Sequence, residues 1–166
     1  MSRDFKWELS GFIFVSIVGT LLHFVYDWSG EMNFVGAFSA VSESVWEHLK
    51  LLFVPTLVWT LIEYFSEYRN IRGFLTAKAI ALLYGMLFIT TAFYLYSGVI
   101  GRTFIFVDVL LFYIGAYITS NYSLKHNSGE RYSNLIGIAV FTVLAVCFVV
   151  FTYVSPDVGI FADMSQ

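Results

Sequence analysis

Residues 134–154 read NLIGIAVFTVLAVCFVVFTYV and contain no charged side chain. An α-helix needs about 20 consecutive, mainly apolar residues to cross the hydrocarbon core of a bilayer. A helix on the surface of a soluble protein would instead carry a polar face along its length. This stretch therefore predicts a transmembrane helix.

Four more apolar runs of this kind precede it in the chain. They cover residues 9–28, 49–65, 74–96 and 103–121. Hydrophobic residues make up 58% of the 166 residues and charged residues only 13%, whereas a soluble domain has about 25% charged residues. The sequence predicts an all-α, polytopic membrane protein with about five transmembrane helices, in a single transmembrane helical domain over residues 1–166.

The segment between the first two runs is harder to assign. From Phe34 to Lys50 its apolar residues have helical spacing. Two interpretations remain open: an interfacial helix that precedes the second span, or the first part of a long second span.

Lysines and arginines predict the orientation, because they are enriched in cytoplasmic loops. Seven of the nine basic residues lie at the N-terminus, in the 66–73 and 122–133 loops, or just inside the third span; they are Arg3, Lys6, Arg69, Arg72, Lys78, Lys125 and Arg131. The expected location is the cytoplasmic membrane, with the N-terminus cytoplasmic and the C-terminus outside. Lys78 is expected to extend its ammonium group towards the interface, and Glu63 to lie at the cytoplasmic end of the second span.

Composition also limits the partners and cofactors. No basic tract is present, so nucleic acid is not an expected partner. Cys147 is the only cysteine, which excludes an intramolecular disulfide and a cysteine-based zinc cluster. The lipid bilayer is the expected partner, and a lipid or small solute is a candidate ligand.

Ionisable residues within a membrane are costly and are functional candidates by default. His23 and Asp27 are four residues apart and share one face of the first helix; Glu43 and Glu47 are expected to do the same on the next helix, with His48 on an adjoining face. Asp108 follows soon after the start of the fourth span. With the orientation above, all of them lie in the outer half of the membrane or at its outer surface.

This set of residues is compatible with three functions. Imidazoles with carboxylates can bind a divalent metal such as zinc, which can activate water for hydrolysis. In that interpretation His23, Asp27 and His48 are the metal ligands, and Glu43, Glu47 and Asp108 supply the catalytic carboxylates. The same residues could instead bind a proton or cation in a small carrier, or form a polar face that docks a partner subunit.

Structural roles compete with each of these assignments. His23 and Asp27 can hydrogen-bond each other, Glu47 and Lys50 can form a solvated i, i+3 pair, and Glu43 can face water. Asp108 has only apolar neighbours in sequence, so it is expected to have a partner. The candidates for that partner are His23, His48, Lys50 and Arg102.

Residues 42–55 read SESVWEHLKLLFVP. This run, with a histidine in the preceding helix, resembles the signature of an uncharacterised family of small multi-pass bacterial membrane proteins, a domain of unknown function. The tail from Pro156 to Asp163 is similar to that of the family as well. The resemblance implies a bacterial membrane location and no established activity.

A looser similarity connects the polar cluster with membrane hydrolases of the ceramidase and adiponectin-receptor type, which build a metal site from helix residues. Those enzymes complete the site with histidines on later helices, including an HxxxH pair. This chain has no histidine in its third, fourth or fifth span. That difference argues against membership, so no catalytic residue is transferred from them.

Overall fold

The computed structural model describes residues 2–126 and 133–163; Arg131, one of the basic residues used above to predict orientation, lies outside them. The described part is helical and contains no strand. Its elements are α1 (Arg3–Trp28), α2 (Asn33–Gly36), α3 (Val45–Glu63), the π-helix η1 (Tyr64–Tyr68), α4 (Phe74–Ile100), α5 (Ile105–His126), α6 (Asn134–Tyr153) and the 3-10 helix η2 (Gly159–Phe161). Five of these helices, with η1 continuing α3, are long and apolar enough to cross a membrane. The predicted fold class is confirmed.

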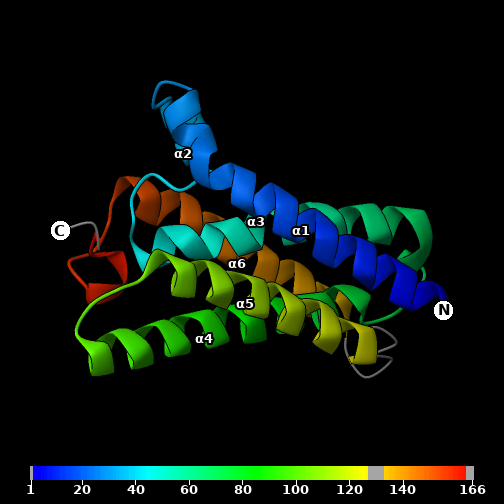
Figure 1. The fold of residues 1–166 in the computed structure, drawn as a ribbon. Helices are drawn as coiled ribbons and strands as arrows, with labels where there is room; N and C mark the ends of the chain where they lie inside the picture. The colour runs from blue at the N-terminus through cyan, green and yellow to red at the C-terminus, as the bar shows by residue number, and fades with distance from the viewer. Residues whose placement is uncertain (1, 127–132, 164–166) are drawn as a thin grey trace.

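The five long helices form a bundle with the two termini at opposite ends (Figure 1). The third helix of the chain, α3, lies at its centre and contacts α1, α4, α5 and α6. In the apolar part of the span formed by α3 and η1, 50% of the residues are buried inside the bundle, compared with 17% in the apolar parts of α1 and of α6. The outer helices therefore leave most of their surface exposed.

That exposed surface is apolar, as lipid contact requires. On α1 the exposed side chains include Leu9, Ile13, Ile17 and Leu21, which follow one another at every fourth position. A soluble protein would bury such a stripe or cover it with another chain. The pattern supports contact between the bundle and a lipid bilayer.

The first helix begins earlier than the apolar run predicts, at Arg3 rather than near Leu9. Ser2 caps it, because its hydroxyl accepts a hydrogen bond from the backbone N–H of Phe5 at 3.3 Å. Glu8 lies within this extension and is only 5% exposed. A charged residue such as Glu8 interrupts an apolar run in the sequence, even where the fold buries it.

Each expectation for residues 34–50 holds only in part, because a short helix precedes the second span and the second helix begins at Val45 and continues through Pro55. Only the short α2 and the first residues of α3 are helical, and the stretch from Ala37 to Ser44 is irregular. Ser44 ends that stretch by capping α3: its hydroxyl accepts a hydrogen bond from the N–H of Glu47 at 3.3 Å. The Ser44-Val45-Trp46-Glu47 sequence matches the capping pattern S-x-x-E, so this boundary is encoded locally.

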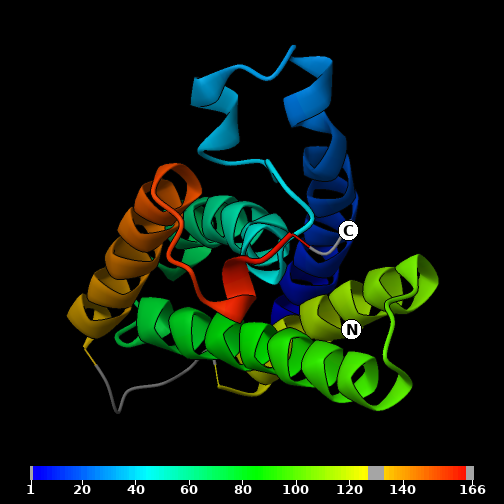
Figure 2. The same ribbon diagram turned by 90° about the vertical axis from the view of Figure 1, so that its left-hand side faces the viewer.

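The C-terminal segment returns to the bundle. Figure 2 shows η2 beside α3 at the end of the bundle that holds the C-terminus. The rings of Trp46 and Phe161 have centroids 5.0 Å apart, and Trp46 also packs against Phe148 of α6. These aromatic contacts hold the tail over the start of α3, next to the residues of the candidate site.

Candidate metal site

Two histidines from different helices face one carboxylate near the C-terminal end of the bundle. His23 lies near the end of α1, and His48 lies in the first turn of α3. Their ring centroids are 5.2 Å apart. Nε2 of His23 lies 3.8 Å from Oε1 of Glu43, and Nε2 of His48 lies 3.4 Å from Oε2 of the same residue. The side chain of Glu43 therefore lies within reach of both imidazoles.

The loop before α3 gives Glu43 this position. Glu43 was expected to share one helical face with Glu47, but it precedes the Ser44 cap and is not helical. The helical repeat of α3 therefore does not determine the direction of its side chain. That side chain points towards the imidazoles, and it is 51% exposed.

The tautomer of His48 is fixed by its own helix. Its Nδ1 lies 2.9 Å from the backbone carbonyl oxygen of Ser44. A carbonyl oxygen can only accept, so Nδ1 carries a proton, and Nε2, which faces Glu43, is the ring nitrogen left to bind a metal. A hydrogen bond from the second ring nitrogen to a carbonyl is the arrangement that orients histidines bound to metals.

The three side chains have the geometry of an incomplete metal site. One ligand atom from each of His23, Glu43 and His48 lies within 4.8 Å of the other two. Ligands of tetrahedral zinc, with bonds of about 2.0–2.1 Å, lie roughly 3.3 Å from one another. The distances from the two Nε2 atoms to the Glu43 carboxylate oxygens, 3.8 and 3.4 Å, are near this value. Two imidazoles and one carboxylate form a donor set that suits zinc and iron, and three protein ligands leave coordination positions open.

A cavity of about 340 Å³ adjoins this group. His23, Glu43 and His48 line part of it, and Asp108 of α5 lines another part. Most of its remaining lining is apolar; it includes Leu51, Ile89, Phe93, Val109, Leu111 and Phe112. The cavity thus combines a few polar groups with a larger apolar surface, which is typical of sites for small-molecule ligands.

A glycine keeps α1 close to α3 beside this cavity. A Cβ atom at Gly19 would lie 2.5 Å from the backbone carbonyl oxygen of Leu51 and 2.5 Å from Cζ of Phe112. Any larger residue would push the two helices apart. Because α1 carries His23 and α3 carries His48, this close approach also sets the separation of the two imidazoles.

The hydrogen-bond partner of Asp108 is none of the four residues expected from the sequence, although His48, one of the four, interacts with its carboxylate electrostatically. The hydroxyl of Tyr96, on α4, donates a hydrogen bond to Oδ1 of Asp108, and the backbone N–H of Phe104 donates to the Tyr96 hydroxyl at 3.3 Å. Tyr96 is the residue that sequence reasoning missed. Its neighbours in sequence are ordinary for a helix end, so only the packing of α4 against α5 identifies it.

Glu47 does not join the histidines. Its carboxylate lies 2.6 Å from Nζ of Lys50 and accepts a hydrogen bond from the N–H of Val41 at 3.0 Å. The expected i, i+3 pair with Lys50 is present, but it is buried and not solvated: the two side chains are 4% and 0% exposed. Lys50 also donates to the carbonyl oxygen of Gly36 and to the hydroxyl of Thr152, each at 2.7 Å.

Asp27 lies one helical turn beyond His23 and is exposed. The group of three converging ligand atoms does not include it. Of the six residues selected from the sequence, the structure brings His23, Glu43 and His48 together, places Asp108 on the same cavity, and sets Glu47 and Asp27 apart.

Comparison with known proteins identifies the family to which the chain belongs. No curated protein and no solved structure matches the chain. One family model matches it over residues 1–166, and that model describes a family of unknown function. The chain belongs to this family, DUF6512.

Proposed function

We propose that this protein is a membrane-embedded, metal-dependent hydrolase in which His23, Glu43 and His48 hold a divalent ion such as zinc. The observation that supports the proposal best is the convergence of both Nε2 atoms on the carboxylate of Glu43, within 3.8 Å. The hydrogen bond from Nδ1 of His48 to Ser44 orients one of these donors in advance.

The reaction class follows from the coordination positions that three protein ligands would leave open on a bound ion. A divalent ion held by three protein ligands supplies an activated water at neutral pH. Asp108 lines the same cavity but is not one of the three ligands. We therefore assign its carboxylate the role of general base. The hydrogen bond from Tyr96 holds the Asp108 carboxylate in one orientation.

The substrate class follows from the cavity lining. Apolar and aromatic side chains form most of its wall, and the charged or ionisable groups on it are the two histidines, Glu43 and Asp108. Such a lining suits an amphiphile, with its chain along the apolar wall and a hydrolysable ester or amide near the metal ligands. With the N-terminus cytoplasmic, as the distribution of basic residues favours, this substrate would enter from the outer half of the membrane.

Glu47 then acts as a positioning residue and not as a catalytic one. Together with Lys50 it binds the backbone of the loop at Val41 and the backbone at Gly36, the residue before the loop. That loop carries Glu43. The buried ion pair therefore fixes the part of the chain from which the third metal ligand projects.

Hydrolysis of a long-chain p-nitrophenyl ester by the zinc-loaded protein in detergent tests this proposal. We expect turnover in the wild type and a decrease of at least about 100-fold in His48→Ala, because loss of a metal ligand affects the bound ion more than loss of a supporting group, which costs roughly 10–100-fold. His126→Ala is the matched control, since His126 is exposed and stacks on Tyr122 at the other end of the bundle. Stoichiometric zinc with no hydrolysis of ester or amide amphiphiles would contradict the hydrolase assignment.

A further inference from the structure

A second polar cluster lies at the opposite end of the bundle from the candidate metal site. Glu8 of α1, Glu63 of α3 and Lys78 of α4 are 5%, 1% and 3% exposed. Nζ of Lys78 lies 2.6 Å from Oε1 of Glu8 and also forms an ion pair with Oε2 of Glu63. The expectation that Lys78 extends its ammonium group to the interface is therefore wrong, whereas Glu63 is the last residue of α3, at the end of the second span as expected, but is buried. Each charge instead finds its partner on another helix.

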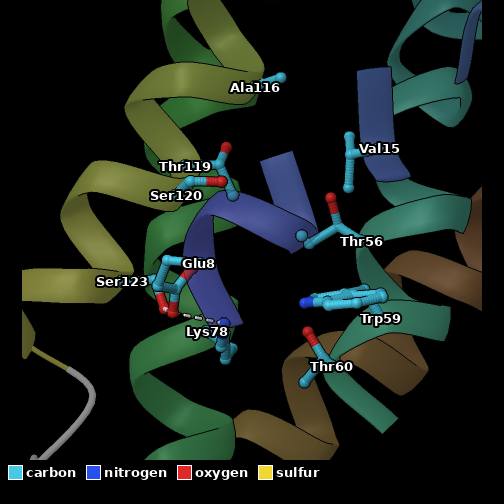
Figure 3. A pocket seen from close by; sticks show the side chains of 11 residues that line it. Glu8, Val15, Thr56, Trp59, Thr60, Lys78, Ala116, Thr119, Ser120 and Ser123 are labelled. Carbon is cyan, nitrogen blue, oxygen red and sulfur yellow. Dashed lines mark hydrogen bonds and ion pairs between the residues drawn. The ribbon is translucent and has the colours of Figure 1, made fainter. Parts of the chain in front are cut away.

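The charges of this cluster do not balance. Two carboxylates share one ammonium group, so the three side chains carry a net charge of −1 when all are ionised. The hydroxyl of Ser123 donates a hydrogen bond to Glu8 at 2.6 Å but adds no charge (Figure 3). A buried ion without a compensating partner costs several kcal/mol.

Two other ion-pairing or hydrogen-bonding groups at this end have partners outside the cluster. Arg3 pairs with Glu67 at 3.1 Å, and both side chains are exposed. Asp4 accepts a hydrogen bond from the hydroxyl of Tyr68 at 2.6 Å. Within the described residues, no second cation is paired with the cluster.

A small cavity next to these residues provides an independent observation. Its volume is about 20 Å³, enough for one water molecule. The hydroxyls of Thr56 and Thr60 lie at this cavity, buried at 5% and 1% exposure, and they form no hydrogen bond within the described part of the chain. Figure 3 shows both threonines around the cavity, together with Glu8 and Lys78. Unpartnered hydroxyls in a polar cavity of this size point to a bound water that links them.

We propose that Glu8 and Glu63 together bind one exchangeable proton, and that a water held by Thr56 and Thr60 gives this proton access to the cluster. A proton on one carboxyl group cancels the excess negative charge and leaves Lys78 paired with the other carboxylate. A sodium ion would have to lie beside the Lys78 ammonium group, which repels it. The site does not depend on the metal proposal, since none of its residues lines the larger cavity.

Infrared difference spectroscopy of the intact protein, in detergent and sodium-free buffer at neutral pH, tests the proposal. A protonated carboxyl group has a C=O stretching band that shifts when the sample is transferred to D₂O. Charge balance predicts that this band is present in the wild type and disappears in both Glu8→Gln and Glu63→Gln. Each of these variants retains one carboxylate and one ammonium group, which form a neutral pair without a proton.

Lys78→Met should change the band in the opposite direction. Without the ammonium group both carboxyl groups are expected to bind protons, so the band should roughly double. Glu67→Gln is the matched control, because it makes the same substitution at an exposed pair outside the cluster and should leave the band unchanged. Asp108→Asn identifies any contribution from the other polar cavity.

Two results would overturn the proposal. One is a wild-type spectrum without an exchangeable carboxyl band, or with a band that remains in both Glu8→Gln and Glu63→Gln. The other is a wild-type band that sodium abolishes in proportion to its concentration, which would identify a sodium site instead. Size-exclusion chromatography of every variant shows whether the protein is folded, and the opposite changes in Glu63→Gln and Lys78→Met cannot both result from unfolding.

Discussion

Nε2 of His48 lies 3.4 Å from Oε2 of Glu43, although the two residues are separated by the boundary between a loop and a helix. In a continuous helix, residues five apart would not point the same way. The Ser44 cap breaks the helix between them, so Glu43 can fold back towards His48 and His23. The site therefore depends on where α3 begins.

Ser44→Ala should weaken this boundary. Loss of an N-cap side chain costs about 1 kcal/mol, with a range of roughly 0.5–2 kcal/mol. We expect the free energy of unfolding to decrease by that amount, measured by reversible denaturation in detergent. Ser155→Ala is the control, since its hydroxyl donates to the carbonyl oxygen of Phe151 and it follows the end of α6, where it caps no helix N-terminus. Equal stability of the two variants would argue against a role for the cap.

The buried pair of Glu47 and Lys50 should respond differently to single and double substitution. Lys50→Met leaves Glu47 as a buried charge without its cation, which costs about 3–5 kcal/mol. The double variant Glu47→Leu/Lys50→Met removes both charges and should recover much of that loss. Arg3→Met breaks an exposed pair and should cost at most about 1 kcal/mol. If the double variant is no more stable than Lys50→Met alone, the ion-pair account is wrong.

Asp108→Asn separates catalysis from metal binding. Asp108 lies on the cavity but is not one of the three converging ligands, so zinc content should remain at the wild-type level. Loss of a general base lowers turnover by about 100–10,000-fold. Parallel measurements of zinc content and ester hydrolysis check this prediction. A variant that loses zinc would place Asp108 among the ligands instead.

The orientation is testable with reporters at the two ends of the chain. An odd number of spans puts the termini on opposite sides of the membrane, and the basic residues at the N-terminal end favour a cytoplasmic N-terminus. A fused alkaline phosphatase, which is active only outside the cytoplasm, should be active at the C-terminus and inactive after the 66–73 loop. The reverse pattern would place the candidate metal site on the cytoplasmic side.

The helices could be predicted from the sequence because their signal is local. Long apolar runs identify the five spans, and the positions of His23 and His48 relative to those runs put the two imidazoles at one depth. The contacts that join different helices could not be predicted in this way. Tyr96 meets Asp108 and Thr152 meets Lys50 only because α4 packs on α5 and α6 packs near α3.

Charged residues were the most difficult to place. Glu63 and Lys78 lie near helix ends in the sequence, where water or lipid headgroups would normally solvate them. Their burial depends on Glu8, which lies in a different helix and outside the apolar run used to define it. Opposite charges at one depth in three helices are a signal for such a cluster, but the apolar periodicity does not reveal it.

Metal content tests the central claim most directly. The purified protein should be treated with a chelator, supplied again with zinc, freed of excess metal and measured by inductively coupled plasma mass spectrometry. We predict close to one zinc ion per chain in the wild type and in His126→Ala, and almost none in His23→Ala/His48→Ala with the fold retained. Absence of zinc from the wild type, or equal zinc in the double variant, would contradict the assignment of His23, Glu43 and His48 as a metal site.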